Sequence, residues 1–215
     1  PYTLPSTNWA TLPPKYMHPD WVSSKMGQVF AIAIDNQSNA YVGTTVMHGQ
    51  FKPGSLGGAG TIYKIDATTG APSAWANLPN SLTANGNIRS GLGDLAYDPD
   101  HNCMFASDFH DGKIYRLNMS GTILQSFDPP LGEALLPGQG FYDPASPSGY
   151  AKKGQRIWGL GYHKNHLYFG VWVEGQQDQD SNRDNELWSV PLDPITGAFT
   201  GPVNGAASYY DFAVL

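Results

Sequence analysis

The chain has little cysteine, little charge and no long apolar run. Its single cysteine, Cys103, cannot pair within the chain, so disulfide bonds do not hold the fold together. Charged residues make up only 14% of the sequence, too few for the exposed faces of helical bundles or coiled coils, which are therefore excluded. A net charge of −6 argues against nucleic-acid binding, which needs a basic surface. No apolar run approaches the ~18 residues of a membrane-spanning helix, so none is predicted.

Glycine, proline and aromatic residues are abundant instead. The sequence has 25 Gly and 17 Pro, and 13% of its residues are aromatic, too many for a disordered chain. Low charge with many Asn, Ser and Thr residues is common in exported proteins, and it predicts a secreted, periplasmic or cell-surface location. The sequence begins at Pro1 without an initiator Met or a signal-peptide pattern, as expected for a processed mature end or an excised segment. Two N-glycosylation patterns, at Asn36 and Asn118, also fit ordinary turn chemistry.

One strand–turn–strand pattern occurs three times. A strand-like run ends in Asp or His, and a polar turn and a second apolar run follow it. The first runs cover 29–35, 92–98 and 157–163, and the second runs cover 40–45, 103–108 and 166–173. The positions at which the first runs end are 63 and 65 residues apart, and three copies in register are hard to obtain by chance.

Each copy continues with two more strands. The third run alternates Ile or Leu and Tyr or Trp with polar residues, which is the period of a half-buried strand. A glycine follows it and is expected to supply the positive φ of a hairpin turn. The third runs are 61–66, 113–118 and 186–193, the glycines are Gly70, Gly121 and Gly197, and weaker fourth runs cover 72–76, 123–127 and roughly 198–203. Four antiparallel strands per copy make one blade of a β-propeller.

The second copy, residues 92–127, resembles an NHL-type β-propeller repeat. It carries Leu92-Gly-Asp-Leu-Ala-Tyr-Asp98, a turn, an apolar strand ending in Asp108, and then Gly112-Lys-Ile-Tyr-Arg-Leu117 followed by Gly121. The first copy is similar with a longer middle loop, and the third copy is similar more loosely.

More distantly, the copies look like blades of the gluconolactonase and regucalcin type. That resemblance implies a divalent metal in a central channel, held by inner Asn and Asp residues and by a Glu before a first strand. No matching Glu precedes Val29, Leu92 or Ile157, so the metal site is not carried over.

Three blades do not close a ring, since propellers typically have about four to eight. We therefore expect an all-β fold: a β-propeller segment of about three four-stranded antiparallel blades, closed by another chain, a second copy or missing sequence. Residues 1–215 are expected to form a single partial propeller domain. Its blades lie near 29–76, 92–127 and 157–203, with closure segments at 1–28 and 204–215.

Strand order places the long loops at one rim of such a propeller. The insertions 47–60, 77–91, 128–156 and 174–185 fall there, and long loops on a rigid scaffold commonly carry binding residues. The candidate ligand-binding residues of this long-loop rim are His48, Arg89, Asp108, His110, Asp111, Arg156 and Glu174.

Four of these residues form one candidate cluster. Adjacent blades could bring His48 near Asp108, His110 and Asp111, and imidazole with carboxylate can hold a metal or move a proton. In the alternative, Asp111-Gly112 is an ordinary hairpin turn and Asp108 is the structural Asp of the family pattern. The other histidines, at turns and strand ends, are given no role: His18, His101, His163 and His166.

An acidic loop is a candidate calcium site. Its alternating oxygen donors could turn toward one point, and Ca²⁺ takes about six to eight oxygen ligands. A helical calcium-binding loop needs Gly at its sixth position, where this run has Arg183. The alternative is a solvated acidic loop without a metal. The candidate ligands are Asp178, Asp180, Asn182, Asp184 and Glu186.

These features favour an extracytoplasmic β-propeller binding module that uses its loop-rich rim to bind a protein, peptide or glycan. No catalytic residue is assigned, and a non-enzymatic role is preferred. The alternative is a Ca²⁺-dependent lactonase-type hydrolase or lyase with a metal in the central channel. A third alternative is a scaffold that assembles with itself or is completed by a partner chain.

Overall fold

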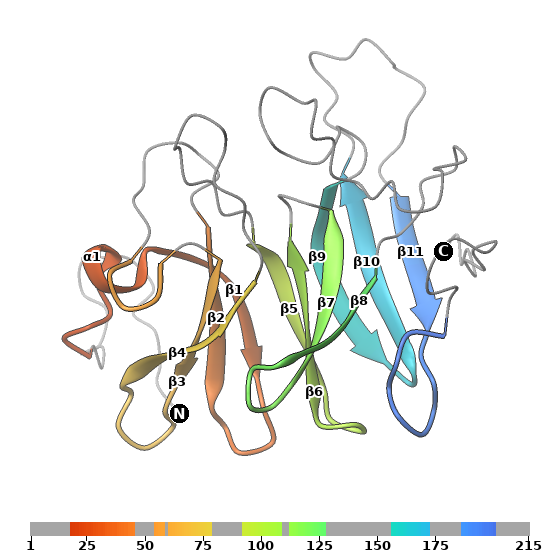
Figure 1. Ribbon diagram of the computed structural model, residues 1–215, viewed down its shortest axis with the longest axis horizontal. Helices are drawn as coiled ribbons and strands as arrows, with labels where there is room; N and C mark the ends of the chain where they lie inside the picture. Colours follow the sequence, from red (N-terminus) through yellow and green to blue (C-terminus); the bar gives the residue numbers. More distant parts are fainter. Residues whose placement is uncertain are drawn as a thin grey trace, which may run out of the picture.

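The computed structural model describes residues 18–45, 54–58, 60–78, 92–108, 112–127, 156–172 and 186–200 (Figure 1). These residues form three antiparallel β-sheets and one short helix. Within this part of the chain, no helix is long and apolar enough to cross a membrane. The sheets confirm the predicted all-β fold built from blade-like antiparallel units.

Each sheet is a meander in which strands that follow one another along the chain lie side by side. The first sheet contains β1 (Gln28–Ile34), β2 (Ala40–Thr45), β3 (Thr61–Ile65) and β4 (Pro72–Asn77). The second sheet contains β5 (Leu92–Asp98), β6 (Cys103–Asp108), β7 (Lys113–Asn118) and β8 (Ile123–Phe127). The third sheet contains β9 (Arg156–His163), β10 (His166–Trp172) and β11 (Glu186–Pro191). These bounds agree with the predicted runs to within about two residues, as expected where strand ends are set by hydrogen-bond criteria.

The turns between the outer strands of each copy form as predicted. Gly70, Gly121 and Gly197 have φ angles of 69°, 84° and 65°, in the region that favours glycine. An Asp or Asn before each glycine accepts backbone N–H groups of the turn, and these residues are Asp66, Asn118 and Asp193. Local side-chain chemistry therefore fixes the same turn three times.

The expected fourth run of the third copy is described only in part. The sequence predicts a strand at about 198–203, and the structure describes this run as far as Thr200. Its described residues pair with the end of β11 through the Leu192–Phe199 bridge, the Asp193 N–H to Ala198 carbonyl bond at 2.8 Å and the Thr200 N–H to Pro191 carbonyl bond at 3.4 Å. Phe199 also binds the second sheet: its N–H donates to Gln125 Oε1 at 2.9 Å and its carbonyl accepts from Gln125 Nε2 at 3.4 Å. Its ring stacks on Phe127 with the centroids 4.9 Å apart, so this run joins the third sheet to the second.

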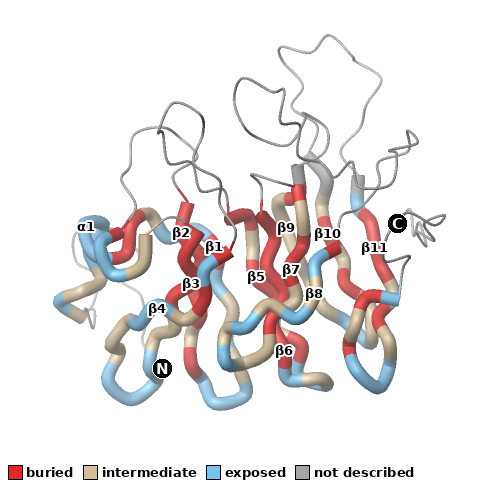
Figure 2. Tube along the Cα trace, in the orientation of Figure 1, coloured by how far each residue is buried: buried red, intermediate tan, exposed pale blue. Residues whose placement is uncertain are grey.

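The second sheet is packed on both faces, between the first and third sheets (Figures 1 and 2). All six residues of β6 are buried, and their side chains alternate between two clusters. Met104 and Ala106 lie in the cluster shared with the first sheet, whereas Cys103 and Phe105 lie in the cluster shared with the third. Strand β5 contacts both β1 and β9, so we refer to β1, β5 and β9 as the inner strands.

The opposite face of the first sheet is covered in part by the segment before it. This segment contains the helix α1 (Ser23–Met26). Met26 packs with Val42 and Tyr63 in a small cluster, and Trp21 and Ile65 pack against its edge. The cover lies on β2 and β3 and leaves Ile32 and Ile34 of β1 exposed.

A turn of each sheet is bound by a side chain of the element before it. The pairs are Trp21 Nε1 with the Gly70 carbonyl at 2.9 Å, Trp75 Nε1 with the Met119 carbonyl at 3.0 Å, and His101 Nε2 with the Pro194 carbonyl at 3.1 Å. The same kind of contact therefore connects the segment before α1 to the first sheet, the first sheet to the second, and the second to the third.

Candidate binding surface on the inner strands

Most residues singled out from the sequence lie outside the described residues. They are His48, Arg89, His110, Asp111 and Glu174 of the long-loop rim and Asp178, Asp180, Asn182 and Asp184 of the acidic loop. Their roles, including the calcium site, stay predictions.

The remaining three lie in strands. Arg156 begins β9 and Glu186 begins β11. Asp108 ends β6, where it pairs with Leu92 of β5 and Lys113 of β7, and its side chain is buried. Asp108 is therefore part of the sheet interior rather than an exposed residue of the rim.

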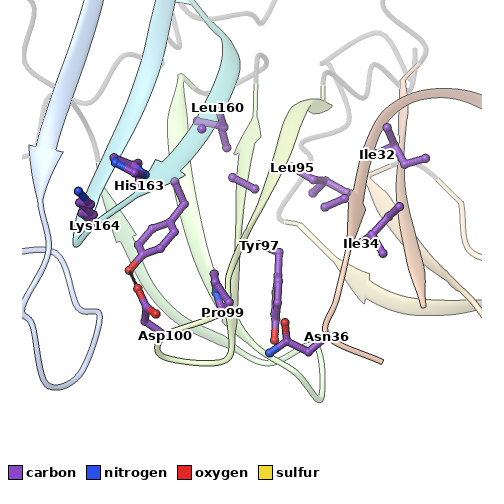
Figure 3. A pocket seen from close by; sticks show the side chains of 14 residues that line it. Ile32, Ile34, Asn36, Leu95, Tyr97, Pro99, Asp100, Leu160, His163 and Lys164 are labelled. Atoms are coloured by element: carbon purple, nitrogen blue, oxygen red, sulfur yellow. Dashed lines mark hydrogen bonds between the residues drawn. The ribbon is translucent and has the colours of Figure 1, made fainter. Parts of the chain in front are cut away.

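The inner strands line an open hollow with a volume of about 610 Å³ (Figure 3). It lies at the end of the strands where their first turns are, and we call it the inner concavity. All three sheets contribute to its lining. The residues are Ile32, Ala33, Ile34 and Asn36 from β1 and its turn, Leu95, Ala96, Tyr97, Pro99 and Asp100 from β5 and its turn, and Leu160, Gly161, Tyr162, His163 and Lys164 from β9 and its turn. An aliphatic and aromatic wall thus ends in a polar edge.

A hydrogen bond between two sheets fixes one side of the inner concavity. The Tyr162 hydroxyl donates to Asp100 Oδ2 at 2.7 Å, which joins β9 to the turn after β5. Burial, and then the bond to Asp100, raise the pKa of the Tyr162 phenol. The phenol therefore stays protonated at neutral pH and remains a donor to the carboxylate.

Tyr97 lies at the middle of the lining, and in Figure 3 its ring stands beside Asn36. Its hydroxyl donates to Asn102 Oδ1 at 2.9 Å, in the turn that follows β5. Burial raises the pKa of the Tyr97 phenol, so it too keeps its proton at neutral pH. Both tyrosine rings are thus held in place by hydrogen bonds before any ligand arrives.

His163 and Lys164 form the polar edge on the third sheet. In the first two copies, Asp35 and Asp98 accept backbone N–H groups of the turn that follows them. His163 replaces this Asp, and the turn shrinks to Lys164 and Asn165, whose φ angles of 45° and 60° are those of a type I′ hairpin. The change leaves an imidazole and an ammonium group exposed at the edge of the concavity (Figure 3).

Asp94 is a half-buried carboxylate that ties β5 to β9. Its Oδ2 accepts the Leu160 N–H at 3.0 Å, and its Oδ1 accepts the Leu95 N–H at 2.8 Å. Burial raises the pKa of Asp94 although both hydrogen bonds act to lower it. Because the bond to Leu160 crosses from β5 to β9, Asp94 positions Leu160 in the lining beside Leu95.

Sequence reasoning did not select Tyr97, Asp100, Tyr162 or Lys164, and it gave His163 no role. The signal that could have found them is the third copy itself, in which His stands where the other two copies have Asp and the turn is shorter. Among the described residues, no group of three or more His, Cys, Asp or Glu side chains is gathered closely enough to hold a metal ion.

No protein-family model and no curated protein matches the sequence. A chain of the mitotic checkpoint complex crystal structure is 13% identical with a TM-score of 0.45, and the match covers 94% of this chain and 49% of that one. Luciferin-regenerating enzyme is 12% identical with a TM-score of 0.43, covering 85% and 48%. The Dos1 propeller is 12% identical with a TM-score of 0.44, covering 86% and 52%. The chain spans about half the length of these structures, and its function is inferred from its own residues.

Proposed function

We propose that the chain is a non-catalytic β-propeller binding module whose inner concavity holds a peptide segment of a protein partner. The observation that carries this proposal is the mixed lining at the point where three sheets converge. The aliphatic side chains of Ile34 and Leu95 stand in the same surface as two phenols and the exposed ammonium of Lys164. Apolar and aromatic linings with a few placed polar groups are typical of binding sites.

Two features of the lining favour a peptide. Tyr97 and Tyr162 are already fixed by hydrogen bonds, so a ligand that packs on them orders few side chains and keeps more of its binding energy. Lys164 supplies a cation for a ligand carboxylate beside an apolar wall, a combination that a peptide with an aliphatic and an acidic residue matches.

The long-loop rim is proposed as a further contact surface of this module, in an extracytoplasmic location. The support for the location is the low charge and the abundance of small polar residues. A glycan is the competing ligand class, because aromatic rings also stack on sugars.

Selection from a random displayed peptide library tests the proposal. Enriched peptides are expected to bind the wild-type chain and to lose affinity by about tenfold or more on Lys164→Glu, which corresponds to ~1.4 kcal/mol. Lys25→Glu makes the same change of charge on α1, outside the lining, and is expected to leave affinity within about twofold. Isothermal titration calorimetry measures both.

Peptides that bind Lys164→Glu and the wild type equally would contradict the inner concavity as their site. Ligands from a glycan array, with no peptide enriched, would show instead that the ligand class is carbohydrate.

A further inference from the structure

We infer that two copies of this chain close one ring of six sheets, each copy packing the open face of its third sheet against the open face of the other copy's first sheet. The first and third sheets lie at opposite ends of the described part of the molecule (Figure 1), and each presents exposed apolar side chains on its outward face. The inference goes beyond the proposed function and does not depend on it.

The interfaces inside the chain show what such a contact requires of an inner strand. Strand register makes Val29, Leu92 and Ile157 equivalent, because they pair with Thr44, Asp108 and Val171 at corresponding places. Leu92 and Ile157 pack against the preceding sheet and are 1% and 0% exposed. Among the described residues no sheet precedes the first one, and Val29 is 46% exposed.

A second inner-strand position repeats this difference. Ile32 and Leu95 are equivalent by register, since they pair with Val42 and Ala106 at corresponding places. Leu95 is 4% exposed in the cluster shared with the first sheet, whereas Ile32 is 61% exposed. The first sheet therefore presents the residues of an interface that no described segment of the chain covers.

The third sheet presents the complementary side. Ile62, Ile114 and Leu187 are equivalent, because they pair with Gly43, Ser107 and Gly170. Ile62 and Ile114 lie in the clusters shared with the following sheet and are 0% exposed. No sheet follows the third one within the described part of the chain, and Leu187 is 48% exposed.

Gly170 shows where the following inner strand belongs. A side-chain carbon at the equivalent Gly43 would lie 3.6 Å from Leu92 Cβ, and the equivalent Ser107 Oγ lies 3.4 Å from the Trp158 carbonyl. Among the described residues, a side-chain carbon at Gly170 would meet nothing within 4 Å. No described residue therefore fills, after the third sheet, the space that an inner strand fills after the first and second sheets.

We assign a second copy to the outward faces of the first and third sheets, because it supplies both halves of an interface that the chain already uses twice. A head-to-tail contact of this kind closes when the rotation per copy allows it, and two copies then bury both open faces. Three sheets per copy give six, within the usual range of about four to eight blades. The second copy's β9 then lies beside β1 and forms the missing wall of the inner concavity, next to Ile32 and Ile34.

Sedimentation equilibrium on the full chain is the first test. The expected mass is about twice 23.3 kDa. Leu187→Glu places a charge on the open face of the third sheet and is expected to give the single-chain mass with unchanged circular dichroism. Ile195→Glu, at a turn position that is 86% exposed, is the control and is expected to keep the doubled mass. A single-chain mass or an open polymer for the wild type would overturn the inference.

A disulfide between copies is the second test, with Val29→Cys and Gly170→Cys combined in one chain. At the equivalent pair inside the chain, a Cβ added to Gly43 would lie 3.6 Å from Leu92 Cβ, within the range of about 3.5–4.5 Å that disulfides require. Oxidation is expected to give covalent dimers, whereas Val29→Cys combined with Ile195→Cys is expected to give none. Cys103 is 1% exposed and does not compete. Absence of the covalent dimer in a folded double variant would overturn the proposed pairing.

The two proposals can fail separately. A single-chain mass together with loss of peptide binding on Lys164→Glu would refute the ring alone. A doubled mass together with a peptide affinity that Lys164→Glu leaves unchanged would refute the proposed function alone.

Discussion

His101 joins the second sheet to the third through both nitrogens of its ring. Nδ1 lies 2.8 Å from Asp98 Oδ2, and Nε2 lies 3.1 Å from the Pro194 carbonyl. Burial alone would lower the pKa of His101, but the hydrogen bonds to Asp98 and Pro194 outweigh it and raise the pKa. At the scale of single residues, the folded chain therefore favours the imidazolium, in which both nitrogens donate.

His101→Ala is expected to lower the free energy of unfolding by about 2 kcal/mol at pH 6. Because the folded pKa lies above the unfolded value of about 6.5, this stabilisation is fully present below that pH and is lost as the pH rises through the folded pKa. Urea unfolding of both proteins at pH 6 and pH 9 measures the difference, which should be smaller at pH 9. The exposed His163→Ala is the control, with an expected change below ~0.5 kcal/mol. An equal loss at both pH values would show that the charge of His101 is not involved.

Cys103 is expected to be chemically inert in the folded chain. Burial, and then the charge of Asp98, raise the pKa of its thiol to about 11, and its side chain is only 1% exposed. The reactive thiolate is therefore scarce at neutral pH. Dithiobis(nitrobenzoic acid) should react with no thiol in the native protein and with one per chain after unfolding in urea. Rapid reaction of the native protein would place Cys103 at an accessible surface, against the structure.

At the scale of elements, Phe199 ties the segment that follows β11 to the second sheet. Phe199 is buried, stacks on Phe127, and meets Phe105 edge to face with the centroids 5.4 Å apart. Phe199→Ala is expected to lower the free energy of unfolding by about 3–5 kcal/mol, because it leaves a cavity between two sheets. Chemical denaturation measures the loss. Ile195→Ala, at an exposed position in the turn just before Phe199, is the control and should lower the free energy of unfolding by less than ~0.5 kcal/mol. A loss below ~1 kcal/mol for Phe199→Ala would mean that this ring does not hold the segment.

The strands were predictable because their causes are local. Period-two alternation and turn glycines occur in every copy, and each copy confirms the others. The exposure of a strand residue has no such local cause. Leu187 and Ile114 have similar side chains at equivalent positions, but Ile114 is buried against a following sheet and Leu187 is exposed. The inner concavity was missed for the same reason, since Tyr97 and Tyr162 come from copies that meet only in the folded chain.

At the scale of the whole molecule, packing is strongest at the centre and weaker toward both ends. Among the described residues, the second sheet is covered on both faces, the first is covered on its far side over β2 and β3, and the third has exposed Leu187 on its far side. Such a gradient is inherent in an arc of stacked sheets, because each sheet contacts only its neighbours.

The contacts between tryptophan or histidine side chains and the turns of the following sheet have a direction. In each pair the donor side chain precedes the turn that it binds along the chain: Trp21 before Gly70, Trp75 before Met119, and His101 before Pro194. A ribosome synthesises the chain in the same order, and domains generally fold as units during synthesis. Each newly made hairpin therefore finds its docking partner already outside the ribosome, and assembly can proceed one sheet at a time without waiting for the C-terminal residues.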